Sequence, residues 1–359
     1  MNFSCVTKVF AGEKGTHLPV LGGWIAAPGH IADINNISLD VYWENPKHWS
    51  IEAYKKLQTD AVLDIYIPKA KEDFRCVDHN SYIRSSFDMD IDDVIAEIDA
   101  WPETEIYAEE LARGFNDEYA EFSADLLNMQ ALCGQNMLYM PPKWGAGAKC
   151  GWYDTFGYEN FFLLIGMYEK HARKMLERGG VMGRHRSGLV ARAVKEGIYP
   201  KAVLMGEDIC TQRGPMVSPE FLEKYYMPQL KQGLEPLLEV GCRPVWHSDG
   251  DTRPIVDMLI DSGIGGMQGF QPECGLSLEY VASKRTRDGG KMLIFGPLAV
   301  TTELPVFTPQ QVRDRILKTA DIYYNNVDWV LFTGNTINPD VPLANIYAMY
   351  ETAREIRYS

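Results

Sequence analysis

Short apolar runs alternate with helix-length segments along this sequence, and the alternation limits the fold more than any other feature. In the second half, five runs rich in apolar or β-branched residues are each followed by a segment long enough for a helix. This pattern is typical of consecutive parallel βα units. The five predicted strands span residues 201–205, 243–246, 266–270, 292–295 and 329–332.

Local signals predict where several units begin and end. Ser218 followed by proline is a typical helix start, with serine as the N-cap and proline in the first helical position. We expect that helix to run to about Val240. Gly296-Pro297 and Gly334-Asn335 are expected to end the fourth and fifth strands. Further helices are predicted over 252–262, 309–325 and 341–356.

Five βα units can wind into an open doubly wound sheet or a closed barrel, and periodicity alone does not choose between them. The first half adds three strand candidates, at 19–24, 61–66 and 136–139, separated by helical stretches. Eight parallel strands favour a (β/α)8 TIM barrel. No repeat, low-complexity tract or Pro/Ser-rich linker marks a second domain. We therefore expect one α/β domain over residues 1–359, a (β/α)8 barrel with an N-terminal helical elaboration.

Composition narrows the classes of partner. The 49 acidic and 35 basic residues give a net charge of −14, which repels nucleic-acid phosphates and anionic lipid surfaces. No stretch of about 18 apolar residues is present, and the first residues lack a basic region followed by an apolar core. We expect a cytoplasmic enzyme with no nucleic-acid or membrane partner. The seven cysteines are too scattered for a disulfide framework or a metal knuckle, and we expect buried reduced thiols.

Polar residues follow the predicted strands, where the active sites of such barrels lie. His247 is the sharpest candidate, because a neutral imidazole can bind a metal or move a proton near pH 7. Asp249 could bind the metal beside it or orient it. Glu273 and Cys274 follow the next strand, and with His247 they could form a cage suited to zinc. Each residue also has a structural alternative, such as a histidine hydrogen-bonded at a strand end.

Glu207 and Asp208 follow the strand at 201–205 and could supply a carboxylate for binding or proton transfer. In the structural alternative, one of them caps a helix or pairs with Arg213. Asn335, after the last predicted strand, adds an amide to the same rim and is expected to bind the substrate.

The segment 140–156 combines glycines with aromatic residues and is predicted to be a substrate-binding loop. Trp144, Trp152 and Tyr153 lie in it, and Trp24 ends the first predicted strand. Such side chains suit a planar or methoxylated aromatic ligand, although packing of the loop onto its own barrel is the alternative.

Familiar nucleotide and hydrolase motifs are absent. The glycine-rich run 263–269 leads into a predicted strand and not into a helix, so it does not fit a dinucleotide fingerprint. The sequence has no Walker loop, GxSxG elbow or HExxH motif.

Several short motifs stand out in the second half of the chain. They are Gly206-Glu-Asp-Ile, Ser218-Pro-Glu-Phe, Pro228, His247-Ser-Asp-Gly, Gln271-Pro-Glu and Pro342-Leu-Ala-Asn-Ile-Tyr-Ala-Met. Together they resemble the uroporphyrinogen decarboxylase superfamily, and the resemblance covers residues 200–359 well and the first half weakly. It implies an α/β barrel. That superfamily contains porphyrinogen decarboxylases and cobalamin-dependent methyltransferases.

Two departures from the family pattern narrow the expected reaction. The decarboxylases carry an N-terminal arginine motif for the carboxylates of the tetrapyrrole, and the segment 19–30 has no arginine. Thiol methyltransferases of the family bind zinc through a His-x-Cys motif and a later cysteine. This chain has His247-Ser-Asp249 in place of the motif, and Asn335 lies near the position of the later cysteine.

The remaining resemblance is to corrinoid methyltransferases that demethylate methoxylated or other methylated substrates. It implies a zinc ion at His247 with oxygen ligands such as Asp249 and Glu273, acting as a Lewis acid on the ether oxygen. Alternatively, Glu207 or Asp208 protonates the leaving oxygen directly. The implied partners are a small-molecule methyl donor and a corrinoid-binding protein that docks over the barrel mouth. A homodimer is compatible with the sequence. A carboxy-lyase acting on a tetrapyrrole and a non-catalytic binding barrel stay open as alternatives.

Overall fold

Parallel strands form the centre of the molecule. The computed structural model describes residues 4–68, 89–269 and 271–358. One sheet has the order β1-β2-β3 and the other the order β10-β9-β8-β7-β4, and every neighbouring pair in both is parallel. The strands are β1 (Leu21–Gly22), β2 (Ala61–Val62), β3 (Leu138–Tyr139), β4 (Ala202–Gly206), β7 (Arg243–His247), β8 (Gly266–Gln268), β9 (Leu293–Leu298) and β10 (Asp328–Thr333).

Each of these strands lies inside or overlaps one of the eight predicted segments, so the prediction of an α/β fold with parallel sheets is confirmed. Phe270, at the end of one predicted strand, lies outside the described residues, as does Cys76. A short antiparallel hairpin of β5 (Cys210–Thr211) and β6 (Gly214–Pro215) follows β4.

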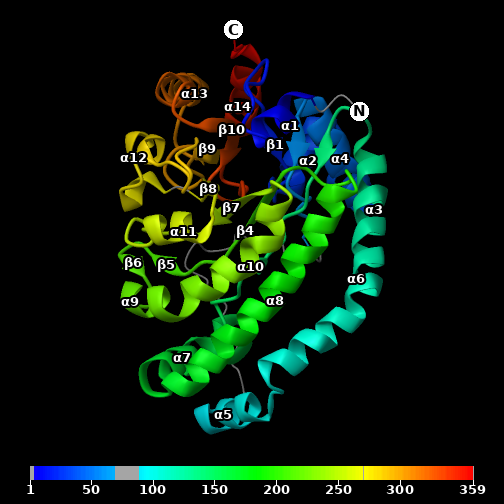
Figure 1. Cartoon of the computed structure of the whole chain (residues 1–359). Helices are drawn as coiled ribbons and strands as arrows, with labels where there is room; N and C mark the ends of the chain where they lie inside the picture. Colours follow the sequence, from blue (N-terminus) through cyan, green and yellow to red (C-terminus); the bar gives the residue numbers. More distant parts are fainter. Residues whose placement is uncertain (1–3, 69–88, 270, 359) are drawn as a thin grey trace.

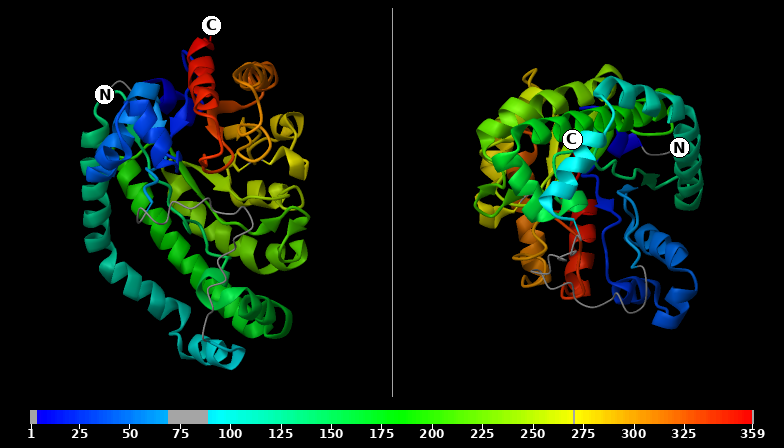
Figure 2. Two further views of the ribbon diagram at one scale, coloured as in Figure 1. Left: turned by 180° about the vertical axis from the view of Figure 1, so that it is seen from behind. Right: turned by 90° about the horizontal axis from the view of Figure 1, so that it is seen from below.

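Helices lie around the outside of the strands (Figure 1), and the view from below in Figure 2 shows them at the periphery. The long helices α6 and α8 pack together, and α10 packs on α8. The helices are α1 (Ser4–Phe10), α2 (Pro28–Asn35), α3 (Leu39–Glu44), α4 (Pro46–Leu57), α5 (Ile91–Ala100), α6 (Thr104–Cys133), α7 (Tyr153–Met167), α8 (Glu169–Lys195), α9 (Pro219–Phe221), α10 (Met227–Glu239), α11 (Val256–Ser262), α12 (Leu278–Ser283), α13 (Pro309–Tyr323) and α14 (Leu343–Glu355), with a π-helical turn at Leu222–Tyr226 and a 3-10 turn at Pro272–Cys274.

Single contacts join the edges of the two sheets. Next to β1, Val20 forms a parallel bridge with Leu331 of β10, whose N–H donates to the carbonyl of Pro19 at 2.9 Å. Beyond β3, the N–H of Lys143 donates to the carbonyl of Leu204 in β4 at 2.9 Å. One contact therefore connects the β1 edge of the first sheet to β10, and the other connects the segment after β3 to β4.

One predicted strand end is wrong. Gly296-Pro297 was expected to stop the fourth strand, but β9 continues through both residues to Leu298, with Pro297 opposite Phe332 of β10. Strand β8 pairs with β9 only at its first two residues, so the proline lies where β9 has a neighbour on one side. A missing N–H is tolerated in such an edge position.

Glycines let the loop after β3 lie against two helices. A Cβ atom on Gly183 of α8 would lie 2.2 Å from the carbonyl oxygen of Gly147, and one on Gly233 of α10 would lie 1.5 Å from the same atom. Both positions therefore require glycine for the observed packing. A Cβ atom on Gly179 of α8 would likewise lie 2.3 Å from the carbonyl oxygen of Lys149, so the loop also lies against α8 directly before Cys150 and Gly151.

Within the described residues, no helix is long and apolar enough to span a membrane. The described cysteines are buried and free, as predicted for reduced thiols.

Candidate functional site

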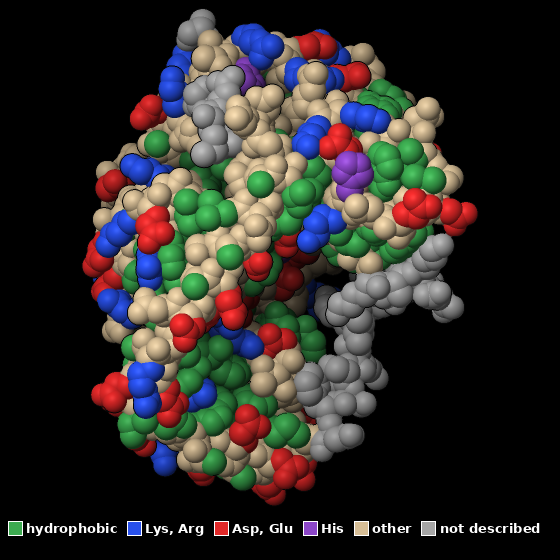
Figure 3. All heavy atoms as spheres, turned by 90° about the vertical axis from the view of Figure 1, so that its right-hand side faces the viewer, with side chains coloured by type: hydrophobic (Ala, Val, Ile, Leu, Met, Phe, Trp, Pro, Cys, Tyr) green, Lys and Arg blue, Asp and Glu red, His purple; other side chains and the backbone are tan. Residues whose placement is uncertain are grey.

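A cavity of about 470 Å³ opens where the parallel strands end. We call it the strand-end cavity. Its walls come from segments that directly follow β1, β2, β4, β7 and β10 and from the loop after β3. Figure 3 shows a face of the molecule that is hollowed, with acidic side chains around the hollow. The cavity is lined by Trp24, Asp64, Tyr66, Pro142, Trp144, Gly151, Tyr153, Asp154, Gly206, Glu207, Asp208, His247, Asn335 and Thr336.

His247, the last residue of β7, is buried and held by a glutamine on the neighbouring strand. Its Nδ1 bonds to Oε1 of Gln268, and Nε2 of Gln268 donates to the carbonyls of Thr333 and Gly334 at 2.8 and 2.9 Å. Because two carbonyls require the amide nitrogen on their side, the glutamine oxygen must face the imidazole. His247 therefore carries its proton on Nδ1, and in the neutral ring Nε2 keeps a free lone pair.

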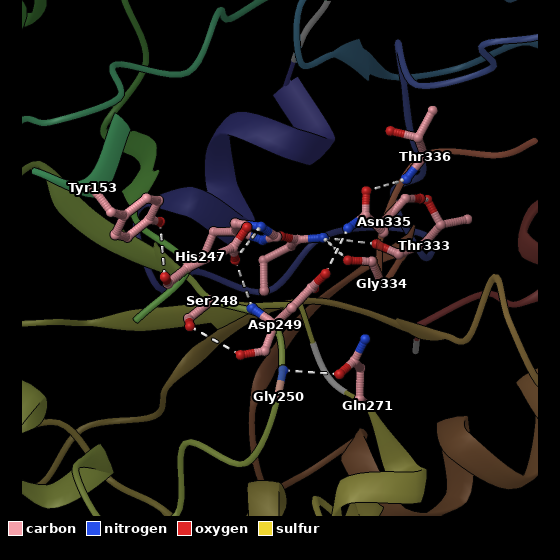
Figure 4. Close-up of polar contacts among 12 residues, drawn as sticks. Tyr153, His247, Ser248, Asp249, Gly250, Gln271, Thr333, Gly334, Asn335 and Thr336 are labelled. Atoms are coloured by element: carbon pink, nitrogen blue, oxygen red, sulfur yellow. Dashed lines mark hydrogen bonds and ion pairs between the residues drawn. The ribbon is translucent and has the colours of Figure 1, made fainter. Parts of the chain in front are cut away.

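Asp208 and Asp249 lie beside that imidazole. One potential ligand atom from each of Asp208, His247 and Asp249 lies within 4.8 Å of the others, which is a group able to hold a metal ion. Oδ1 of Asp208 lies 3.5 Å from Nε2 of His247 and accepts the N–H of Asp249 at 2.9 Å. Figure 4 shows the side chain of Asn335 directed at Asp249, to whose Oδ2 it donates at 2.8 Å.

Asp249 has a carboxyl oxygen without a partner. Within the part of the chain that the structure describes, its Oδ1 is buried and accepts no hydrogen bond. Burial raises the pKa of Asp249 to about 6, against the lowering effect of the nearby His247 and of the hydrogen bond from Asn335. A buried carboxylate oxygen of this kind costs free energy unless a proton or a cation meets it.

Glu207 lines the cavity, and unlike Asp249 it has hydrogen-bond partners for both carboxyl oxygens. Its oxygens accept the backbone N–H groups of Cys150 and Gly151 at 2.8 and 2.5 Å. Burial raises the pKa of Glu207 to about 7, although both N–H groups act to lower it. The side chain is therefore fixed in position and can hold or release a proton near neutral pH.

Of the four predicted aromatic contacts, three line the cavity. The rings of Trp24 and Trp144 lie 6.1 and 5.6 Å from the imidazole of His247, centroid to centroid. Trp144 is 45% exposed, so much of its ring faces the cavity opening. The hydroxyl of Tyr153 donates to the carbonyl of Asp208 at 2.9 Å.

Trp152 does not line the cavity. It is buried and packs on Trp101 and Phe156, with ring centroids 5.4 and 5.8 Å away. Alternation along the loop at the start of α7 turns its ring into the core while Tyr153 faces the cavity. The structure thus places Trp152 in a packing position, which was the alternative for this loop.

Glu273 and Cys274, predicted as metal ligands, lie outside the ligand group. Glu273 is exposed and accepts the hydroxyl of Thr301 at 2.9 Å. The buried Cys274 thiol lies 3.5 Å from Oε1 of Gln271, and burial raises its pKa, which disfavours the thiolate that a metal needs. Both are in the 3-10 turn after β8, which carries them past the strand end. Asp208, predicted for catalysis, takes the place beside His247.

Sequence reasoning missed Gln268 and Asp64. Asp64 follows β2 with a backbone φ of 72°, in the left-handed region that residues other than glycine rarely adopt. Its Oδ1 accepts the hydroxyl of Tyr139 at 3.2 Å, and it lines the cavity with Tyr66. The prediction placed Asp64 inside the strand at 61–66, whereas β2 ends at Val62. The carboxylate within that apolar run was the available signal for an earlier strand end.

Comparison with solved structures gives a match over the full length of the chain. No protein-family model and no curated protein matches the sequence. Among solved structures, a methyltransferase from Methanosarcina mazei matches with a TM-score of 0.63 and 15% sequence identity, and the match covers 98% of each chain. At this identity the similarity establishes a shared fold over the whole chain, and the reaction has to be argued from the site.

Proposed function

We propose that this protein is a methyltransferase that removes a methyl group from a small methylated substrate and passes it to the cobalt of a corrinoid held by a partner protein. One observation carries the proposal: His247 offers a free Nε2 between Asp208 and Asp249 in a cavity walled by aromatic rings. The full-length structural similarity to a methyltransferase supports it. The resemblance of short motifs to cobalamin-dependent methyltransferases supports the corrinoid acceptor.

We also propose that the eight parallel strands form one closed (β/α)8 barrel in a single domain. The bridge from Val20 to Leu331 and the hydrogen bond from Lys143 to Leu204 support closure at both joints between the sheets. In a barrel, the segments after the strands meet at one mouth, which accounts for a cavity lined from six strand ends.

The residues present fit a zinc ion. Two carboxylates and one imidazole are three ligands, as in catalytic zinc sites that keep a fourth position open. The unpartnered Oδ1 of Asp249 is the atom that such an ion would satisfy, and the two negative charges of Asp208 and Asp249 would balance a divalent cation. When bound, zinc would act as a Lewis acid on the leaving atom of the substrate.

The aromatic residues of the cavity would bind the substrate, and Glu207 would donate a proton to the leaving oxygen. For a methoxylated aromatic substrate, the ring would pack against Trp24 and Trp144, with its ether oxygen towards Glu207. As the methyl carbon bonds to cobalt(I), the electron pair of the breaking C–O bond stays on oxygen, and the proton of Glu207 would neutralise it. The Gly151 and Cys150 amides would then stabilise the Glu207 carboxylate that remains.

The charge of the cavity argues against tetrapyrrole decarboxylation. Among the described residues that line it, none is a lysine or arginine, and four carry carboxyl groups. Asp154 pairs with Lys149 at 2.7 Å, which leaves Asp64, Glu207 and Asp208 to face a substrate with many carboxylates as like charges.

Methyl transfer to free cob(I)alamin tests the proposed function. Purified protein is assayed with a panel of methoxylated aromatic donors by the absorbance change of the corrinoid, and its metal content is measured. We expect Asp208→Asn and His247→Ala to lose activity and bound zinc together, while His48→Ala, on the exposed surface of α4, keeps both. Full activity of metal-free protein would eliminate the zinc site, and release of carbon dioxide from a tetrapyrrole would favour the decarboxylase.

A further inference from the structure

A second cavity of about 470 Å³ lies at the opposite end of the strands, and we call it the amino-end cavity. Val20 precedes β1 and Asp60 precedes β2, so this cavity lies where these strands begin. The end of α14, which contributes to it, is at the top of Figure 1, away from α5 and α7. The cavity is lined by Thr16, His17, Leu18, Val20, Gln58, Asp60, Arg354 and Arg357.

Asp60 is the only carboxylate among the described residues that line this cavity, and both of its oxygens already have hydrogen-bond partners. Oδ1 of Asp60 lies 2.9 Å from Nε2 of His17, and Oδ2 accepts the N–H of Val20 at 2.9 Å. The hydrogen bond to Asp60 raises the pKa of His17 to about 10, so the pair is an imidazolium and a carboxylate whose charges cancel.

Two guanidinium groups remain without a negative partner. Arg354 donates to the neutral Oε1 of Gln58 at 2.8 Å. Arg357 makes no hydrogen bond or ion pair through its side chain within the described chain. The amino-end cavity therefore carries two uncompensated positive charges on a protein whose net charge is −14.

Not every arginine that lines a surface cavity of this protein lacks a carboxylate partner. A third cavity lies between the start of α6 and helices α8 and α10. It is lined by Arg173 and Arg184, and each pairs with a carboxylate. Arg173 bonds to Glu177 at 2.9 Å and Arg184 to Glu235 at 2.5 Å. The arginines of the third cavity are thus neutralised by the protein itself.

The backbone holds the arginines of the amino-end cavity in place. Arg357 forms an antiparallel bridge with His17, and the flanking N–H groups of Leu18 and Tyr358 donate to the carbonyls of Ile356 and Thr16 at 3.1 Å each. Arg354 lies one turn earlier, at the end of α14. Both guanidinium groups therefore extend from anchored backbone, which lowers the entropy lost on binding.

We propose that the amino-end cavity binds the phosphate group of a small molecule. A phosphate monoester carries about −1.5 to −2 charges at neutral pH, which matches the two unpaired arginines. Guanidinium groups bind phosphate oxygens by paired charge-assisted hydrogen bonds, and Thr16 and Gln58 add a hydroxyl and an amide at the same wall. The site is separate from the strand-end cavity and does not depend on the proposed methyl transfer.

Isothermal titration with inorganic phosphate, at constant ionic strength set with chloride, tests this site in the full-length protein. We expect saturable binding at one site, weakened about tenfold or more by Arg357→Gln, because a charge-assisted bond contributes about 1.5–3 kcal/mol. Arg354→Gln should weaken it similarly. Arg173→Gln removes an exposed arginine elsewhere and should leave the affinity unchanged.

Three results would overturn the proposal. The first is the absence of saturable phosphate binding to the wild-type protein. The second is binding that persists unchanged in both Arg354→Gln and Arg357→Gln, which would place the phosphate elsewhere. The third is succinate binding as tightly as phosphate, which would make the site one for carboxylates.

Discussion

Replacing Gln268 with methionine should destabilise the protein and weaken metal binding at His247, although Gln268 does not line the cavity. Gln268 is 2% exposed and makes three hydrogen bonds, one to His247 and two to the carbonyls of Thr333 and Gly334. Methionine has a similar length but offers neither the acceptor nor the donors. At about 1 kcal/mol for each net hydrogen bond, Gln268→Met should lower the free energy of unfolding by ~3 kcal/mol.

The same substitution should free the imidazole to exchange its proton between the two nitrogens. Where an outer hydrogen bond fixes a metal-binding histidine, its loss typically costs about 10–100-fold in metal affinity. Urea denaturation would measure the stability, ¹⁵N spectra of histidine would report the tautomer, and zinc titration would give the affinity. Gln310→Met, on the exposed face of α13, is the matched control. If Gln268→Met keeps both the wild-type stability and the Nδ1-protonated tautomer, the account of His247 is wrong.

Three further predictions follow from the charges and the packing. Asp249→Asn should raise the free energy of unfolding of the metal-free protein by ~2 kcal/mol above pH 6, because a carboxyl group whose pKa is raised to about 6 is costly to ionise in the folded state. Since this folded-state pKa lies above the unfolded value, the stability of the wild-type protein should fall as pH rises from about 4 to 6. Urea denaturation of the variant should lack this pH dependence. His17→Gln should lower the free energy of unfolding by ~2 kcal/mol more at pH 6 than at pH 11 by the same assay, since the stability from a histidine pKa of about 10 is present below pH 6.5 and is lost as pH rises through 10. Gly151→Ala should lower kcat for methyl transfer at least tenfold with little change in melting temperature, because the added Cβ would lie 2.8 Å from both Oε2 of Glu207 and Cε1 of Tyr153 and displace these cavity side chains. Unchanged kcat would mean that the position of Glu207 does not matter for the reaction.

The strand pattern was predictable because it depends on local composition. Every predicted strand segment overlaps a parallel strand, since short apolar runs flanked by helices have few other ways to bury themselves. The edges were less predictable, as β9 shows by running through Gly296-Pro297. Whether a proline interrupts a strand depends on the neighbouring strands, which the local sequence does not specify.

The sequence allowed the location of the site to be predicted, but only some of the residues that form it. His247 and Asp249 were named because they follow a strand, and they do lie together with Asp208. The parallel register of β4 and β7, with Gly206 opposite His247, brings the residues after both strands side by side. Gln268 could not be found in this way, because its role depends on a contact across three strands that no local pattern encodes.

Carboxyl groups at the two ends of the strands differ in how their oxygens are satisfied, and this difference bears on function. At the strand-end cavity, Oδ1 of Asp249 is buried and accepts no hydrogen bond within the described chain. At the amino end, Asp60 has both oxygens satisfied. A buried oxygen without a partner costs about 1–3 kcal/mol and persists where the surrounding structure holds it in place for a purpose. A cation at the Asp208, His247 and Asp249 group would meet the unpartnered Oδ1 of Asp249, so metal binding there should raise the free energy of unfolding.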